Sequence, residues 1–426
     1  MQGYSGGPLY DGIHLANTSK IIVVTTNYRL NAFGFLYTGT EDSTSIDGNY
    51  GIQDQRLAMK FVKENIASFG GDPDHVTITG QSAGAQSVAT HLISENSAPY
   101  FDSAMIFSNP MGLPFRDNNS AISWGRLVAS KAACANESSS LKEIEKCLRA
   151  LDAETILKGE VEAHSDILAE LSDLLHVLEP WGPIIGTKDC PTQPLYAMAN
   201  RTYIQHDKPI ITGTVTNEGW MFIYEAFGFK IPSFALDILL PLVFGEHAGS
   251  KIKSKYPVPP SMENDTRPLL ATIATDGLFH CPVRHAMQSL SNASTQNVWI
   301  YHFDHVSSFS KQEWGRNYSM CYDNVCHAAD LIYWFKMNVS MYGVNYTESE
   351  SKLANSMGEY TGNFVHHHVP GSPASEPLSW PAYNSTSKGA HTMMHLKTPS
   401  NQLENAPMAD ICDYWDNEVT YSYVAK

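Results

Sequence analysis

The feature that most constrains the fold is an apolar stretch that runs directly into a serine bounded by glycines. Residues 75–79 have the composition of a strand, and residues 80–84 follow with the pattern Gly-x-Ser-x-Gly. Small and apolar residues at positions 83–93 then favour a helix. A serine on a sharp turn between a strand and a helix projects its hydroxyl clear of the sheet. Glycine on both sides of the turn removes side chains that would collide with the neighbouring strand and helix.

This turn predicts a nucleophile at Ser82, shaped by Gly80 and Gly84. The backbone N–H of Ala83 lies where the helix begins, so it can point to a developing oxyanion with the help of the helix dipole. The alternative is a turn with a purely structural role. A serine hydroxyl also needs a base and an orienting acid, and composition alone does not choose the base among the seventeen histidines.

Strand and helix patterns alternate along the chain, which predicts an α/β fold with a mostly parallel sheet. The β-branched run IIVVTT is typical of a strand buried on both faces of such a sheet. Residues 51–67 have apolar positions at helical spacing, and residues 118–178 are helical in pattern. No linker between independent domains is visible, so we expect one domain over residues 1–426. The expected strands are residues 21–26, 75–79, 104–107, 209–214 and 298–303, and residues 370–388 are expected to form a loop.

Charge and composition exclude several classes of protein. The formal net charge of −16 disfavours nucleic acid as a partner, because its phosphates would be repelled. Hydrophobic residues make up 43% of the chain, which is enough for a sizeable buried core. No run approaches the roughly 18 apolar residues that a membrane-spanning helix needs. The nearest candidate, residues 231–244, is interrupted by Pro232, Asp237 and Pro241, and we expect a buried helix or a loop there.

Sequons and cysteines predict a glycoprotein of the secretory pathway, either secreted or held in its lumen. The seven cysteines include no Cys-x-x-Cys pair and no His/Cys cluster with zinc spacing, so neither thiol redox chemistry nor a metal site is expected. Such a protein should begin with a signal segment, but this chain opens MQGYSGGPLYDG, so we expect Met1 not to start the natural precursor. The sequons begin at Asn17, Asn118, Asn136, Asn200, Asn264, Asn292, Asn317, Asn338, Asn345 and Asn384.

The longest motifs resemble the type-B carboxylesterase and cholinesterase family. The segments NYRLNAFGFL (residues 27–36) and GNYGIQDQRLAMKFVKENIASFGGDPDHVTITGQSAG (residues 48–84) are similar to the family's signature block. The likeness continues through TVTNEGWMF, CYDNVCHAADLIYWF, WPAY and CDYW, and it extends over essentially the whole chain. The resemblance implies an α/β-hydrolase fold, with a mostly parallel central sheet flanked by helices. It also implies hydrolysis of small carboxylic esters without a metal or organic cofactor.

The resemblance assigns roles to individual residues. Ser82 matches the nucleophile, Glu218 in Thr-Asn-Glu-Gly matches the triad acid, and His327 in Val-Cys-His-Ala matches the general base. This is the chain order Ser, Asp/Glu, His of α/β-hydrolases. The alternatives are a solvated loop carboxylate for Glu218 and a residue at a helix start for His327. Further matches are a buried ion pair (Arg29 and Asp54), a serine near the triad (Ser108), an acyl-pocket or core side chain (Phe115), and two disulfides (Cys134–Cys147 and Cys281–Cys412).

Several positions depart from the family pattern. Cys321 and Cys326 would form an additional short disulfide loop that braces His327, which leaves Cys190 single. Gln81 stands where family members usually carry Glu, so a preference for choline esters is not expected. The family's first strands and its Gly-rich HGG-type motif, which supplies the other oxyanion donors, would lie before residue 1. We therefore expect an N-terminally truncated chain that lacks those strands and retains Ala83 as a donor.

Two other functions stay open at this point. The family includes non-catalytic members that act in adhesion, storage or binding. Retention of all three triad residues favours the enzyme, whereas the missing oxyanion donors favour the non-catalytic alternative. Metal binding through His366, His367 and His368 is disfavoured, because adjacent residues do not all face one ion. The natural ester, its acyl length and the oligomeric state are not predicted.

Overall fold

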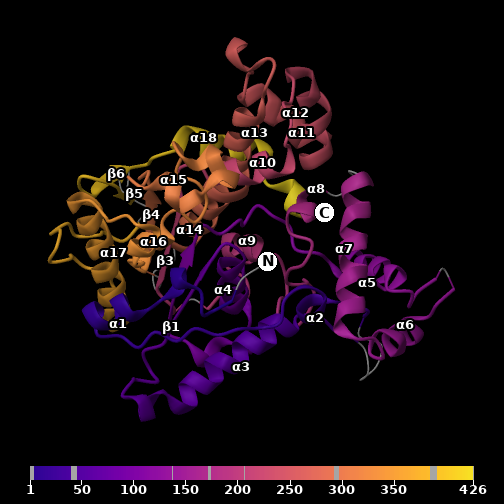
Figure 1. Ribbon diagram of the computed structural model, residues 1–426, viewed down its shortest axis with the longest axis horizontal. Helices are drawn as coiled ribbons and strands as arrows, with labels where there is room; N and C mark the ends of the chain where they lie inside the picture. Colours follow the sequence, from indigo (N-terminus) through magenta and orange to yellow (C-terminus); the bar gives the residue numbers. More distant parts are fainter. Residues whose placement is uncertain are drawn as a thin grey trace.

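A sheet of six strands forms the centre of the molecule, in the order β1-β2-β3-β4-β5-β6 (Figure 1). Strands β1 to β5 are parallel to their neighbours, and β6 runs antiparallel to β5, which confirms the predicted mostly parallel sheet. The computed structural model describes residues 4–39, 46–136, 138–170, 174–205, 207–291, 297–383 and 391–425. The strands are β1 (Thr77–Gln81), β2 (Ser103–Phe107), β3 (Ile210–Val215), β4 (Val298–Phe303), β5 (Thr392–Leu396) and β6 (Gln402–Asn405).

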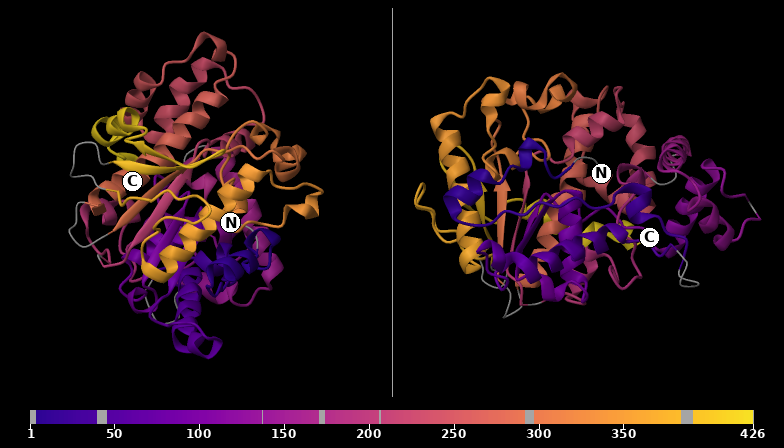
Figure 2. Two further views of the ribbon diagram at one scale, coloured as in Figure 1. Left: turned by 90° about the vertical axis from the view of Figure 1, so that its left-hand side faces the viewer. Right: turned by 60° about the horizontal axis from the view of Figure 1, so that its bottom comes forward.

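Helices connect the parallel strands and lie on both sides of the sheet (Figure 2). Helix α4 (Ala83–Ile93) joins β1 to β2, α14 (Cys281–Ser291) precedes β4, and α17 (Glu348–His367) lies between β4 and β5. The other α-helices are α1 (Ile13–Ser19), α2 (Asn31–Phe35), α3 (Tyr50–Asn65), α5 (Asn118–Lys131), α6 (Leu141–Leu148), α7 (Ala153–Glu170), α8 (Leu174–Leu178), α9 (Pro194–Asn200), α10 (Trp220–Ala226), α11 (Leu236–Phe244), α12 (Glu246–Lys255), α13 (Arg267–Ala274), α15 (Ser310–Trp314), α16 (Leu331–Trp334) and α18 (Ala409–Tyr414).

The hydrophobic core is divided in two by the sheet. Successive side chains of a strand point to opposite faces. In β2, Ala104 and Ile106 therefore join the cluster formed with α4, α9 and α14. Met105 and Phe107 join the cluster on the other face, with α16 and α17. Because every residue of β2 is buried, this strand lies at the centre of the fold, as expected for a parallel strand covered on both faces.

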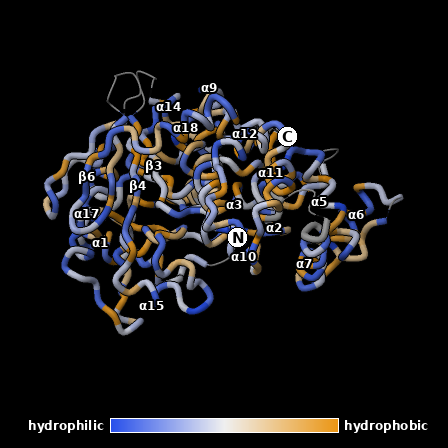
Figure 3. The backbone as a smooth tube through the Cα atoms, turned by 90° about the horizontal axis from the view of Figure 1, so that it is seen from above, coloured by the Kyte–Doolittle hydropathy of each residue, from blue (hydrophilic) through white to orange (hydrophobic). Residues whose placement is uncertain are grey.

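A smaller cluster lies at one end of the molecule, where α5, α6 and α7 pack around Trp124 and Trp181 (Figure 1). The two indole rings lie 5.3 Å apart at an angle of 55°. The disulfide Cys134–Cys147 connects the segment after α5 to α6. Hydrophobic and hydrophilic residues are mixed along α6 and α7, as expected for helices at the periphery (Figure 3). The prediction that residues 118–178 are helical is confirmed.

The prediction of a strand at residues 21–26 is wrong. These residues form no strand, and Ile22 and Val24 are 45% and 54% exposed. A strand needs a neighbour to accept and donate its backbone hydrogen bonds. Among the described strands, β1 is the edge and pairs only with β2, so residues 21–26 do not pair with this edge.

The helix predicted at residues 51–67 is present as α3, but its predicted apolar face is only partly buried. Ile52 and Ile66 are buried, whereas Leu57 and Phe61 are 65% and 58% exposed. The spacing of apolar residues therefore located this helix correctly. It did not show which of these apolar residues are buried against other parts of the described chain.

The apolar run at residues 231–244 forms a helix, which was one of its two predicted states. Leu236, Leu240 and Phe244 of α11 are buried at helical spacing, and Ile238 on the opposite side is 67% exposed. Among the described residues, no helix combines the length and the apolar character that crossing a membrane would require. Strands β5 and β6 were not predicted.

Candidate active site

Ser82 occupies a strained turn between β1 and α4, as the Gly-x-Ser-x-Gly pattern predicts. Its φ of 57° and ψ of −121° together define a backbone conformation that residues with a side chain rarely adopt. The Ser82 N–H donates to the carbonyl of Phe107, at the end of β2, over 3.0 Å. The carbonyl of Ser82 accepts from Gln86 N–H over 2.9 Å, which is the first bond of the helix. The turn is thus held on both sides, and strain of this kind is concentrated at functional sites.

The two glycines of the turn are not equivalent. A Cβ at Gly80 would lie 2.2 Å from the carbonyl oxygen of Gly84, so only glycine fits at position 80. A Cβ at Gly84 would meet no atom within 4 Å. The prediction that both glycines avoid collisions is therefore correct for Gly80 and wrong for Gly84, because the space beside Gly84 is open in the described part of the chain.

Glu218 and His327 lie in direct contact, although 109 residues separate them in the sequence. The Oε2 atom of Glu218 contacts Nδ1 of His327, and both side chains are buried. The other carboxylate oxygen, Oε1, accepts from Val215 N–H over 2.8 Å, where β3 ends. This backbone bond fixes the carboxylate, and the carboxylate in turn orients the imidazole with its Nδ1–H toward Glu218.

Asn217 brings the two segments together. Its N–H donates to the carbonyl of Val325 over 2.9 Å, and its Oδ1 accepts from Val325 N–H over 3.0 Å. A parallel β-bridge also pairs Asn217 with Cys326. The predicted disulfide Cys321–Cys326 is formed and ends one residue before His327. The loop that carries the imidazole is therefore tied to the end of β3 and closed on itself.

The second ring nitrogen of His327 contacts Gln81, not Ser82. Nε2 of His327 lies 2.9 Å from Nε2 of the Gln81 amide. Since Nδ1–H faces Glu218, Nε2 carries the lone pair and accepts a hydrogen bond from this amide. Among the described residues, the Ser82 hydroxyl has no hydrogen bond. The structure thus brings the imidazole to the side chain next to the predicted nucleophile, with the predicted bond to Ser82 not formed.

Two phenylalanines that the sequence analysis did not single out surround the imidazole. The rings of Phe222 and Phe279 lie 5.0 and 5.2 Å from that of His327. Phe222 falls in the quoted motif TVTNEGWMF, which was the available signal. Their apolar surface excludes water from the imidazole, which strengthens its interaction with Glu218.

A second buried carboxylate, Asp330, was also missed. Its Oδ2 accepts from the Tyr301 hydroxyl over 2.7 Å and from Nε1 of Trp334 over 3.2 Å. Burial, assisted by the charge of Glu218 and opposed by the bond from Tyr301, raises the pKa of Asp330 to about 6. The residue lies in the quoted motif CYDNVCHAADLIYWF, so its proximity to His327 was available from the sequence.

Ser108 and Phe115 are both buried, and within the described chain the Ser108 hydroxyl has no hydrogen-bond partner. Ser108 follows β2 with a φ of 49°, and its N–H donates to the carbonyl of Gly213 over 2.8 Å. Phe115 packs in the main core cluster and lines a small cavity with Asn109 and Leu195. Burial agrees with the packing alternative for Phe115, and its role in an acyl pocket stays a prediction.

Arg29 and Asp54 form the predicted ion pair, but it is not buried. Nε and Nη2 of Arg29 each lie 2.8 Å from a carboxylate oxygen of Asp54. The side chains are 51% and 25% exposed, because no part of the described chain covers them. The hydrogen bonds from Arg29 lower the pKa of Asp54. An ion pair this open contributes little to stability.

The cysteines pair as predicted. Cys281–Cys412 joins α14 to α18, Cys134–Cys147 and Cys321–Cys326 are also formed, and Cys190 is a buried free thiol whose pKa is raised by burial. The predicted sequons at Asn292 and Asn384 lie outside the described residues. The other sequon asparagines are all exposed: Asn17, Asn118, Asn136, Asn200, Asn264, Asn317, Asn338 and Asn345.

Comparison with known proteins agrees with this architecture. The sequence profile of the carboxylesterase family matches residues 2–415 of this chain. The crystal protein of Dictyostelium discoideum is 32% identical over 415 residues, which are 97% of this chain and 71% of that protein. The cholinesterase of Mus musculus is 28% identical over 97% of this chain and 67% of its own length. A solved PNB esterase superposes with a TM-score of 0.78 at 26% identity, over 97% of this chain and 78% of the esterase.

The sequence resemblance, the parallel sheet and the strained serine turn thus lead to one assignment. The chain belongs to the carboxylesterase family and has the α/β-hydrolase fold of its esterases.

Proposed function

We propose that this chain is a secreted serine carboxylic-ester hydrolase that acts through an acyl-enzyme on Ser82. The observation that carries the proposal is the buried contact between Glu218 and His327, next to a serine held in a strained turn. His327 acts as the general base and Glu218 orients it. Membership of the carboxylesterase family supports the same reaction class.

Each residue has a defined part in this reaction. His327 Nε2 takes the Ser82 proton while Oγ attacks the ester carbonyl, and Glu218 stabilises the imidazolium that forms. The N–H of Ala83 donates to the oxyanion of the tetrahedral intermediate. His327 then protonates the departing alcohol, and it activates water to hydrolyse the acyl-enzyme. The Gln81 amide leaves Nε2 in this step, so that Nε2 can receive the proton from Ser82.

Secretion and glycosylation belong to the same proposal. All sequon asparagines in the described residues are exposed, which an oligosaccharide requires. Three disulfides are formed, as is typical of proteins that fold in an oxidising compartment. Treatment of protein from the secretory pathway with peptide N-glycosidase should reduce its mass, and protein with unchanged mass would contradict this part.

The test of catalysis is covalent labelling. A fluorophosphonate should label the folded chain at Ser82, and Ser82→Ala should abolish labelling. Ser87→Ala is the matched control, because this serine lies on the same helix, α4, where its hydroxyl donates to the Ala83 carbonyl and accepts from the Gln55 amide, each over 3.1 Å. Labelling should be followed by turnover of short-chain aryl esters. A correctly folded chain that neither labels nor turns over any ester in a panel would overturn the proposal.

A non-catalytic protein with this fold is the second candidate, and one observation favours it. The lone pair of His327 is occupied by Gln81, and Ser82 has no hydrogen bond among the described residues. This candidate predicts no labelling at Ser82 in any condition, so the same experiment separates the two.

A further inference from the structure

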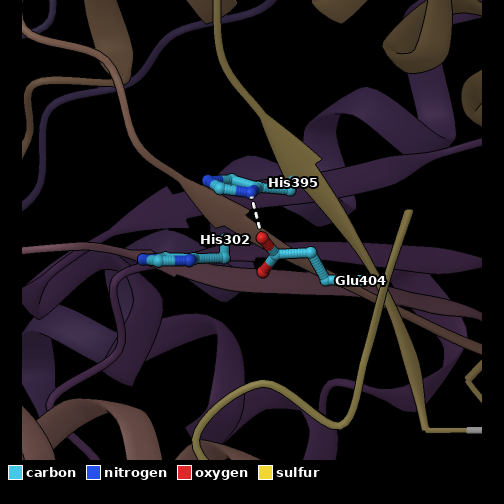
Figure 4. Close-up of side chains that lie close together, drawn as sticks. All are labelled: His302, His395 and Glu404. Carbon is cyan, nitrogen blue, oxygen red and sulfur yellow. Dashed lines mark ion pairs between the residues drawn. The ribbon is translucent and has the colours of Figure 1, made fainter. Parts of the chain in front are cut away.

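Two histidines and a glutamate lie side by side on three neighbouring strands, away from the Glu218–His327 pair. They are His302 on β4, His395 on β5 and Glu404 on β6 (Figure 4). His302 and His395 are direct partners in the parallel register, and Glu404 is opposite Met393, two residues from His395. Because side chains alternate along a strand, all three project from the same face of the sheet. One ligand atom from each lies within 4.8 Å of the others.

The hydrogen bonds leave Nδ1 of both imidazoles available for a ligand. Nε2 of His302 lies 3.1 Å from the Thr216 hydroxyl, and Nε2 of His395 lies 3.3 Å from Oδ2 of Asp304. Within the described chain, Nδ1 of His302 and Nδ1 of His395 are buried and have no hydrogen-bond partner. Histidines that bind metals characteristically donate their other ring N–H to a carboxylate or another polar group, which fixes the ring and its tautomer.

The carboxylate of Glu404 is directed toward the two imidazoles, which are stacked 5.2 Å apart (Figure 4). Its Oε1 lies 2.5 Å from Nδ1 of His395, which is an ion pair when the imidazole is protonated but lacks the geometry of a hydrogen bond (Figure 4). The His395 side chain is 6% exposed and that of Glu404 is 35% exposed. The carboxylate is therefore partly open to solvent, whereas both Nδ1 atoms are buried.

From this arrangement we infer that His302, His395 and Glu404 bind one Zn²⁺ ion. Two imidazole nitrogens and one carboxylate oxygen suit zinc, whereas Mg²⁺ and Ca²⁺ prefer oxygen ligands only. Zinc at about 2.0–2.1 Å from each ligand places them roughly 3.3 Å apart in a tetrahedron. The two rings are stacked at 13° to one another, so the imidazoles must tilt toward each other and the Glu404 side chain must rotate for the three atoms to reach that distance. Water completes the coordination.

The ion would connect β6, the antiparallel edge strand, to β5 and β4. It would also lie close to the loop that carries Glu218, because the Thr216 hydroxyl that contacts His302 is only two residues away in sequence. The site is independent of ester hydrolysis, so its test does not depend on the proposed activity. A metal site was not expected from the sequence, because these three ligands are not closely spaced and lie 93 and 9 residues apart.

The test uses the full chain, stripped of metal with a chelator and titrated calorimetrically with zinc chloride. We expect saturable binding of one ion per chain, and Co²⁺ in its place should give the visible absorption bands of a four-coordinate N/O site. The double variant His302→Gln/His395→Gln and the single variant Glu404→Gln should lose this binding. Asp304→Ala, which removes the carboxylate that contacts His395, should weaken zinc binding by about 10- to 100-fold.

The matched control is His366→Gln/His367→Gln, which removes two exposed histidines of α17 and should leave zinc affinity unchanged. Zinc should raise the thermal unfolding midpoint of the wild-type chain and of this control, but not that of Glu404→Gln. This isosteric variant distinguishes loss of the site from loss of the fold, because its metal-free midpoint should match that of the wild type. Absence of one-to-one binding by the folded wild type, or equal affinity in the double histidine variant, would overturn the inference.

Discussion

The side-chain amide of Gln81 donates a hydrogen bond to Nε2 of His327 over 2.9 Å, at the lone pair that would accept the proton of Ser82. Gln81 therefore competes with Ser82 for the base. We expect Gln81→Ala to increase the rate of Ser82 labelling by a fluorophosphonate. Loss of a hydrogen bond worth about 0.5–1.5 kcal/mol corresponds to an increase of roughly 2- to 10-fold. Gln312→Ala, at an exposed position, serves as the control. Slower labelling of Gln81→Ala would show instead that the amide holds His327 in its productive position.

Glu218→Gln should abolish most ester turnover without unfolding the chain. Glutamine keeps an oxygen to accept from Val215 N–H, but its amide N–H₂ can face Nδ1 of His327 and favour the wrong tautomer. We expect kcat to fall by about 10³- to 10⁴-fold, as in triads whose acid is replaced by its amide. Glu218→Asp keeps the charge and should retain more activity than the amide. Equal kcat for wild type and Glu218→Gln would exclude Glu218 from the triad.

Local pattern predicted the centre of the fold well, because its determinants are contiguous. The strand, turn and helix around Ser82 were found to within two residues, and α4 spans Ala83–Ile93 as predicted. Residues 21–26 show the limit of such reasoning. Their β-branched composition favours a strand, but a strand forms only where a neighbour completes its hydrogen bonds, and composition does not report the neighbour.

The contacts of the site depend on long-range pairing that no local pattern shows. Glu218 and His327 were chosen from the family resemblance, and they meet because Asn217 pairs with Val325. Chain order could not show that His327 would contact Gln81 and not Ser82. Neither could it show the cluster of His302, His395 and Glu404, since β5 (TMMHL) and β6 (QLEN) were not recognised as strands.

The two glycines of the turn should differ sharply in their tolerance of alanine. Gly80→Ala places a Cβ 2.2 Å from the Gly84 carbonyl, which cannot move without disrupting the first turn of α4. We expect it to unfold the chain or to cost more than about 3 kcal/mol of stability. Gly84→Ala meets no atom within 4 Å and should stabilise the helix by about 0.5–1 kcal/mol. Urea denaturation of both variants checks this contrast, and similar losses of stability in the two would contradict it.

Asp330 should make the fold less stable as pH rises from about 4 to about 6. Its pKa is about 6 in the folded chain, against an ordinary value of 3.8, so the folded state holds a proton that the unfolded state has lost in this interval. The stabilisation is therefore fully present below pH 3.8 and lost as pH rises through 6, by up to about 3 kcal/mol.

Asn at position 330 stays neutral and keeps an oxygen that can accept from the Tyr301 hydroxyl. The free energy of unfolding of Asp330→Asn, relative to wild type, should increase between pH 4 and pH 6 and then remain constant above pH 7. Urea denaturation at unit pH intervals measures this difference. Asp74→Asn makes the same change from carboxylate to amide at a side chain that is 81% exposed, and it serves as the control. If the free energy of unfolding of Asp330→Asn and of the wild type changed with pH in the same way, the Asp330 carboxylate would be ionised in the folded chain and stabilised by Tyr301 and Trp334.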